Sequence, residues 1–218
     1  MPFRIISIGA LSHHELWDRP QAQRTAHATT TLIQAGGKNL LVDPGLPEQA
    51  VVARLEERAG LAPADIHMVF ITNFRPAHRR GVGAFAQAKW FISEMEREVV
   101  GRKLVEDFQQ QDADDTRELY RQEIAMLKRF EPAPDQLLPG VDLFPLPGFT
   151  PGNCGLLLPE PKRTVLLAGD AVPTVEHLQQ KRVLRGAYDV EAAQDSLVEA
   201  LEIADVIVPG HDNVVVNR

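Results

Sequence analysis

Residues 71–81 of the chain read ITNFRPAHRRG and continue from an apolar run, Met68–Thr72, with the composition of a buried β-strand. A loop that follows a strand is held by a rigid scaffold, which is where binding and catalytic side chains concentrate. This loop contains an amide (Asn73), a guanidinium group (Arg75) and an imidazole (His78) within six residues. The stretch therefore predicts a strand that leads directly into a functional loop.

Three further loops repeat this arrangement. They read LPGFTPG (residues 146–152), AGDA (168–171) and VPGHD (208–212), and each follows an apolar run. Asp170 and His211 are prominent among their polar side chains. In a layered α/β domain, such strand-end residues are expected to converge on one surface site.

Strand-type runs alternate with helical patterns in both halves of the chain. The predicted strands are Phe3–Ile8, Thr29–Ile33, Asn39–Val42, Met68–Thr72, Trp90–Ile92, Val141–Leu146, Gly155–Leu158, Thr164–Ala168 and Val206–Val208. The predicted helices are Pro47–Arg58, a pair within Ser93–Phe130 that breaks around Asp112–Asp115, and Val190–Ile203. No low-complexity linker separates the halves, so we predict one domain over residues 1–218, with α/β layers in which helices cover the sheets.

Five elements of the chain, in this order and spacing, resemble the metallo-β-lactamase superfamily of hydrolases. LVDPG (41–45) is similar to the early Asp–Gly turn of that family, and residues 72–78 to its Thr-His-x-His-x-Asp-His loop. PGFTPG (147–152) is similar to its Pro-Gly-His-Thr-Pro-Gly loop, Gly169-Asp170 to its bridging-aspartate loop, and Gly210-His211 to its last ligand loop. The resemblance implies a four-layer αββα sandwich with two metals at the sheet edge, here with a helical insertion at about residues 93–132.

The metal ligands implied by the resemblance are only partly present. The three histidines of the first metal would stand at positions occupied by Asn73, Arg75 and Phe149. An aspartate of the second metal would stand at Ala77. Of the seven implied ligands the chain keeps three, which are His78, Asp170 and His211. We therefore expect the first metal site to be lost.

Two functions are compatible with the remaining half-site. Two imidazoles and a carboxylate match the three-ligand pattern of catalytic zinc and the facial triad of iron. The first function is a hydrolase with one divalent metal (zinc, iron or manganese) that cleaves an ester, lactone, thioester or phosphodiester, with Asn73, Arg75 and Asp170 as candidate catalytic residues. The second is a metal-free family member that binds an anionic ligand or a protein partner without hydrolysing it.

The arginines of the first loop suggest a replacement for the lost metal. Arg75 is permanently cationic, and we hypothesise that it pairs with Asp170 and stabilises an oxyanion in place of the first cation. Arg79 and Arg80 follow closely, and arginines at the mouth of a site can bind a phosphate or carboxylate of the substrate. Ordinary surface arginines fit the sequence equally well.

Other histidines are expected to be peripheral. His13 and His14 have the pattern of a solvated loop pair near the N-terminus, and His177 lies in a polar stretch after Asp170.

The charge balance and the cysteine content of the sequence argue against several classes of function. The 218 residues include 23 Lys and Arg against 30 Asp and Glu, and the resulting net charge of −7 argues against a nucleic-acid-coating role. The single cysteine, Cys154, cannot form an internal disulfide, and no apolar run approaches the roughly 18–20 residues needed to cross a membrane. We therefore expect a cytoplasmic globular protein, and the sequence is compatible with homo-oligomers. The expected partner is a small, anionic molecule and not a membrane.

Overall fold

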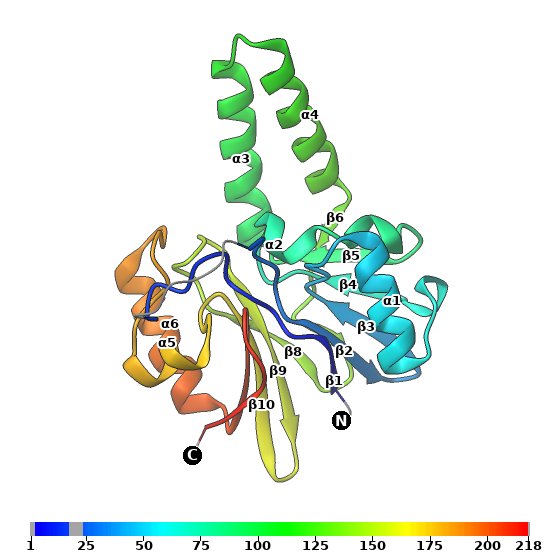
Figure 1. Cartoon of the computed structure of the whole chain (residues 1–218), viewed down its shortest axis with the longest axis vertical. Coiled ribbons are helices and arrows are strands. Elements are labelled where there is room, and N and C mark those ends of the chain that lie inside the picture. The colour runs from blue at the N-terminus through cyan, green and yellow to red at the C-terminus, as the bar shows by residue number, and fades with distance from the viewer. Residues whose placement is uncertain (1–2, 18–23, 218) are drawn as a thin grey trace.

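The chain folds into two β-sheets that pack face to face, with helices on their outer faces (Figure 1). The structure is a computed structural model and describes residues 3–17 and 24–217. Each sheet has six strands within these residues. The expectation of mixed α/β layers with helix-covered sheets is therefore confirmed.

The first sheet has the strand order β1-β2-β3-β4-β5-β6. Its strands are β1 (Phe3–Ser7), β2 (Thr30–Ala35), β3 (Lys38–Val42), β4 (Met68–Phe70), β5 (Lys89–Ile92) and β6 (Phe130–Pro132). The first three pair antiparallel, and the last four pair parallel. The elements between the parallel strands include α1 (Glu48–Ala59), η1 (Pro63–Asp65), α2 (Pro76–Arg79) and η2 (Val82–Phe85).

The second sheet has the order β12-β11-β10-β9-β8-β7. Its strands are β7 (Gln136–Leu138), β8 (Val141–Pro145), β9 (Cys154–Glu160), β10 (Arg163–Gly169), β11 (Val206–Pro209) and β12 (Val215–Val216). Only β10 and β11 pair parallel. Two helices, α5 (Val175–Gln180) and α6 (Val190–Ile203), cover the outer face of this sheet.

Burial on both faces explains why the central strands are continuously apolar. In β3, Leu40 and Val42 belong to the core between the sheets, whereas Leu41 belongs to the core beneath α1. In β10, Leu166 packs against the residues of α5 and α6 while its neighbours face the opposite sheet. Successive side chains of a strand point to opposite faces, so a strand covered on both sides needs apolar residues at every position.

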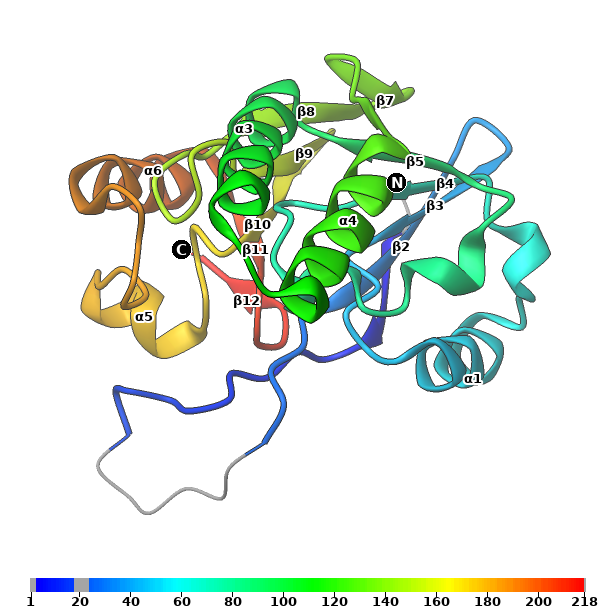
Figure 2. The ribbon, with the colours of Figure 1, turned by 90° about the horizontal axis from the view of Figure 1, so that it is seen from above.

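A helical hairpin projects from the body of the protein (Figure 1). It consists of α3 (Glu94–Gln110) and α4 (Asp114–Lys128), so the predicted pair of helices with an acidic break is confirmed. Seen from above, the hairpin lies over the junction between the two sheets (Figure 2). Across the described residues, no helix combines the length and the hydropathy needed to cross a membrane.

Several short elements differ from the sequence prediction. The strands β6, β7 and β12 and the helices α2 and α5 were not expected, and Val206–Val208 is not the last strand because β12 follows it. These elements have two to six residues. Such short segments lack a full period of any hydrophobic pattern, so tertiary pairing and packing decide their conformation.

Candidate functional site

The ends of β3, β4, β10 and β11 bring polar residues from four parts of the chain together. His78 comes from α2, Asp170 directly follows β10, and His211 follows β11. One ligand atom of each of these residues lies within 4.8 Å of the others, and all three residues are buried. The structure thus unites the three residues that the sequence retains from the half-site.

His78 lies between two carboxylates. Its Nε2 is 2.9 Å from Asp170 Oδ2, and its Nδ1 is 3.0 Å from Asp43 Oδ2. The Asp43 carboxylate also accepts hydrogen bonds from the backbone N–H and the hydroxyl of Thr72, each at 2.8 Å. These contacts fix both the position and the ring orientation of His78.

The two carboxylates favour the protonated form of His78. Burial lowers the pKa of the imidazole, but the charges of Asp170 and Asp43 and their hydrogen bonds raise it more, to about 10. Burial also disfavours the charged form of Asp170 and so raises its pKa. The charges of the adjacent His78 and His211 and their hydrogen bonds outweigh this effect and hold the pKa of Asp170 well below its ordinary value. Without a metal, the pair is therefore a buried imidazolium–carboxylate ion pair at neutral pH.

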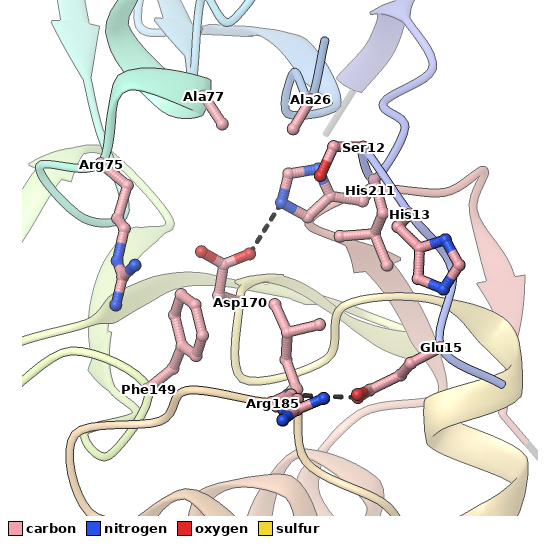
Figure 3. A pocket seen from close by; sticks show the side chains of 12 residues that line it. Ser12, His13, Glu15, Ala26, Arg75, Ala77, Phe149, Asp170, Arg185 and His211 are labelled. Atoms are coloured by element: carbon pink, nitrogen blue, oxygen red, sulfur yellow. Dashed lines mark hydrogen bonds and ion pairs between the residues drawn. The ribbon is translucent and has the colours of Figure 1, made fainter. Parts of the chain in front are cut away.

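His211 approaches the other oxygen of the same carboxylate. Its Nδ1 donates a hydrogen bond to the backbone carbonyl of His27 at 3.0 Å, which directs Nε2 toward Asp170. His211 Nε2 lies 2.9 Å from Asp170 Oδ1 (Figure 3). Oδ1 is buried, and the His211 ring is the polar group that contacts it. His211 and His78 thus approach the two different oxygens of the carboxylate.

Asn73 is joined to Asp170 by a hydrogen bond. Its side-chain N–H donates to Asp170 Oδ2 at 3.0 Å and to Asn153 Oδ1 at 3.1 Å. Asn153, at the end of the loop before β9, in turn donates to the carbonyl of Leu146 at 3.0 Å. One amide thereby links the loop after β4, the loop before β9 and the central carboxylate.

The predicted ion pair between Arg75 and Asp170 is wrong. The guanidinium carbon of Arg75 lies over the ring of Phe149, 4.6 Å from its centroid, and the side chain is directed past Asp170 (Figure 3). Arg75 occupies the N-cap position of α2 with an extended backbone (φ −63°, ψ 144°), and its side chain makes no capping hydrogen bond. The neighbours of the Asp170 carboxylate are instead His78, His211 and Asn73.

Because Arg75 is exposed and rests on an aromatic ring, we expect the Arg75→Ala variant to lose no more than about 1 kcal/mol of unfolding free energy. Urea denaturation of the variant and the wild type measures this difference. A loss above about 3 kcal/mol, as for breaking a buried ion pair, would instead support a surrogate-cation role for Arg75.

Arg79 and Arg80 point away from the pocket beside Asp170. Arg79 is buried, pairs with Glu123 of α4, and donates to the carbonyl of Phe74 at 2.7 Å. Arg80 donates to the carbonyl of Ala26 at 3.2 Å. Neither residue lines the pocket that Asp170 enters, so the contacts give both arginines structural roles. Substrate binding by them has no geometric support here.

A pocket of about 570 Å³ opens onto Asp170 and His211 (Figure 3). Arg75 and Phe149 form one wall. The other lining residues include Leu11, Ser12, His13 and Glu15 near the N-terminus, and Leu184 and Arg185. A small molecule can therefore reach the carboxylate and one imidazole of the buried cluster.

The N-terminal wall of the pocket is fixed to α5. His14 is buried, not solvated as predicted, and stacks on Trp17 with ring centroids 4.4 Å apart. Its Nε2 lies 3.1 Å from Glu176, which also accepts a hydrogen bond from the Trp17 indole at 2.8 Å. His177 lies in α5 and not in a polar loop, and its Nε2 is 3.5 Å from Glu15. These contacts hold residues 14–17 beside the pocket.

The carboxylate of Glu176 is expected to stabilise this wall in a pH-dependent way. Burial raises its pKa, but hydrogen bonds from Trp17 and Thr174 and the charge of His14 lower it more, from 4.5 to about 2. A depressed pKa stabilises the fold above pH 4.5, and this stabilisation is lost as the pH falls toward 2. We expect Glu176→Gln to cost about 1 kcal/mol at pH 7, a value discounted for partial exposure, and progressively less below pH 4.5.

Urea unfolding at several pH values between 7 and 3 measures this trend. Glu199→Gln, an exposed change on α6, is the matched control. A destabilisation by Glu176→Gln that stays constant across this pH range would contradict the role of the charge.

Some site residues were missed in the sequence. Asp43 binds His78 and has a left-handed backbone conformation, with φ of 49°. The signal was present, because DPG (43–45) follows an apolar strand in the same way as the other site loops. Asn153 and the carbonyl of His27 gave no such signal, since their roles depend on how distant loops meet.

His78, Asp170 and His211 form a group that could hold one divalent cation. His78 and His211 both direct Nε2 at Asp170 while their Nδ1 atoms are bound to an acceptor, which is the usual orientation of histidine ligands. The Asp170 carboxylate supplies an oxygen ligand beside them. The positions of Arg75 and Phe149 offer only a cation and an apolar ring, so they cannot complete a second site.

Comparisons with known proteins agree with this fold. A family model described as the metallo-beta-lactamase superfamily matches residues 25–211. Metallo-beta-lactamase domain-containing protein 1 of Xenopus laevis is 27% identical over 192 residues, which cover 85% of this chain and 71% of the relative.

Solved structures give the same result for the fold. AidC, a dizinc quorum-quenching lactonase, superposes with a TM-score of 0.69 at 19% identity, over 85% of this chain and 72% of AidC. A mutant of AiiA from B. thuringiensis, with N-decanoyl-L-homoserine bound at its active site, has a TM-score of 0.67 at 21% identity, over 96% and 92% of the two chains. The family match, the αββα layers and the strand-end site together show that this chain belongs to the metallo-beta-lactamase superfamily.

Proposed function

We propose that the protein is a hydrolase of this superfamily that works with a single divalent metal on His78, Asp170 and His211. The observation that carries this proposal is the pair of imidazoles aimed at opposite oxygens of one buried carboxylate, each with its Nδ1 bound elsewhere. Zinc, iron and manganese all accept such a donor set.

The protein residues around the half-site have distinct roles in this proposal. A bound metal supplies Lewis acidity and lowers the pKa of a water molecule. Asp43 and the carbonyl of His27 hold the two imidazoles in position, and Asn73 fixes the Asp170 carboxylate through its amide. Arg75 lies in the pocket wall, where its guanidinium can stabilise negative charge that develops on the substrate.

The pocket favours a small substrate that carries both an apolar part and an anionic group. Leu11, Leu184 and Phe149 provide apolar surface, whereas Arg75 and Arg185 provide positive charge. Neither arginine side chain has an ion-pair partner among the described residues, but Glu15 lines the same pocket and accepts the backbone N–H of Arg185 at 3.1 Å. We propose an ester or lactone with a carboxylate or phosphate as the most suitable class, and thioesters and phosphodiesters as further classes to test.

A second candidate function is anion binding without hydrolysis. The protonated His78 between Asp170 and Asp43 forms a network that needs no cation, which is the observation in favour of this alternative. A metal at this position would have to displace the proton on Nε2. In this alternative, the two pocket arginines bind the ligand and the buried cluster acts as scaffold.

Hydrolysis assays separate the two functions. Untagged protein is stripped with a chelator, reloaded with zinc, manganese or iron, and assayed with esters, lactones, thioesters and phosphodiesters, alongside Asp170→Ala. Metal-restored turnover that Asp170→Ala abolishes is the expected result. Absence of turnover with every metal, together with binding of phenyl phosphate by the stripped protein, would favour the second function.

A cytoplasmic location belongs to the same proposal, because the one cysteine, Cys154, is a buried free thiol that needs no oxidising compartment. Self-association is likewise a proposal, to be tested by sedimentation.

A further inference from the structure

Glu96, in the first turn of α3, is a fully buried carboxylate outside the half-site. A buried carboxylate must be compensated by hydrogen bonds or an opposite charge. No ion pair to Glu96 occurs among the described residues, so its compensation comes from hydrogen bonds. Its position at the start of α3 adds a favourable interaction with the helix dipole.

The hydrogen bonds of Glu96 connect two separate loops of the site. Oε1 accepts the backbone N–H of Phe74, between Asn73 and Arg75, at 3.0 Å. Oε2 accepts the backbone N–H of Gly152, three residues after Phe149, also at 3.0 Å. One carboxylate thus bridges the loop after β4 to the loop before β9, with one oxygen for each.

The start of α3 is packed tightly against the second loop. The Ser93 hydroxyl donates to the carbonyl of Gly152 at 2.6 Å and accepts the N–H of Glu96 at 3.2 Å. A Cβ atom at Gly152 would lie 2.1 Å from Glu96 N, so only glycine allows this approach. Both backbone polar groups of Gly152 are therefore held by the helix.

We propose that Glu96 is a positioning residue that fixes the separation of the two loops and, through them, the pocket wall and the Asn73 amide. The wall consists of Arg75 on one loop and Phe149 on the other, with the guanidinium carbon 4.6 Å from the ring centroid. Asn73 lies in the first loop, and its amide donates both to Asp170 and to Asn153, at the end of the second loop. A change in loop separation should therefore alter all three contacts. This inference deepens the proposed function, and only its zinc test rests on it.

Two substitutions test this role. Glu96→Gln keeps the size of the side chain but presents an NH₂ group to one of the two N–H donors. Glu96→Asp keeps the charge, but is one methylene too short to reach both loops. Glu98→Gln, which changes an exposed glutamate of the same helix, is the matched control.

The first measurement is the ¹H–¹⁵N NMR spectrum of chelator-treated protein, which needs no metal. We expect the side-chain signals of Asn73 and Arg75 to move in both Glu96 variants, together with the backbone signals of Phe74 and Gly152, while Glu98→Gln leaves all four in place. Movement of the two backbone signals alone would overturn the proposal, because it would show a local role without effect on the site.

The second measurement is the zinc dissociation constant by chelator competition. We expect it to rise by about tenfold or more in both Glu96 variants, as for residues that orient metal ligands, and not in Glu98→Gln. Unchanged zinc affinity with a folded variant would contradict the role in positioning. Absence of zinc binding by the wild type would refute the proposed function, and the NMR result would still decide the role of Glu96.

Discussion

The Asp170→Asn variant should lose about 3–5 kcal/mol of unfolding free energy in the absence of metal. The carboxylate contacts two imidazoles and the Asn73 amide, and it is buried apart from the side that faces the pocket. An amide at this position keeps one acceptor oxygen but removes the charge, so the buried imidazolium of His78 retains only Asp43 as its counter-charge. Removing one partner of a buried pair is costly because the other charge remains in the protein interior.

Urea denaturation of chelator-treated protein measures this loss. Asp195→Asn, an exposed change on α6, is the control and should alter the free energy by less than about 0.5 kcal/mol. A loss below about 1 kcal/mol for Asp170→Asn would show that the cluster is not the ion-pair network described above.

Restoring the three absent histidines should create a second metal site. We expect the triple variant Asn73→His, Arg75→His and Phe149→His to bind one more zinc per chain than the wild type. The loops that carry these positions are already held at a short distance by Glu96, through backbone N–H bonds of Phe74 and Gly152 that the three substitutions leave in place. Three imidazoles facing the Asp170 carboxylate would supply the donors that an amide, a guanidinium and a phenyl ring do not.

Zinc titration followed by elemental analysis measures the stoichiometry of the triple variant. The single variant Arg75→His is the control and should bind no additional zinc, because one imidazole with two unsuitable neighbours cannot complete the site. A triple variant that folds and binds no more zinc than the wild type would show that the loops do not retain the geometry of a first metal site.

The fold could be predicted from the sequence because its main elements carry strong local patterns. The run Leu40–Val42 is apolar at each position, as a strand covered on both faces must be, and Gly36 and Gly37 supply the left-handed turn of the hairpin before it. Helix α1 ends at Ala59, and Gly60 follows it in the left-handed conformation that glycine adopts readily at the end of a helix. By contrast, β12 has two residues and depends on pairing with β11.

The site was predicted only in part. His78, Asp170 and His211 each lie in a strand-end loop with a recognisable motif, and the structure places them together. The orientation of Arg75 could not be predicted, because it depends on the backbone at the start of α2 and on the position of Phe149. The burial of His14 could not be predicted either, because it depends on contacts with Trp17 and Glu176. Glu176 is distant in the sequence, and the spacing of His14 and Trp17 matches no recognisable motif.

The most direct test of the single-metal account is the metal content of the wild-type protein. Untagged protein purified from cells grown with zinc, iron and manganese would be measured by elemental analysis beside Asp170→Ala. The account predicts about one divalent metal per wild-type chain and none in the variant. No metal in either sample, even after soaking in zinc, would contradict the account, as would two metals per wild-type chain.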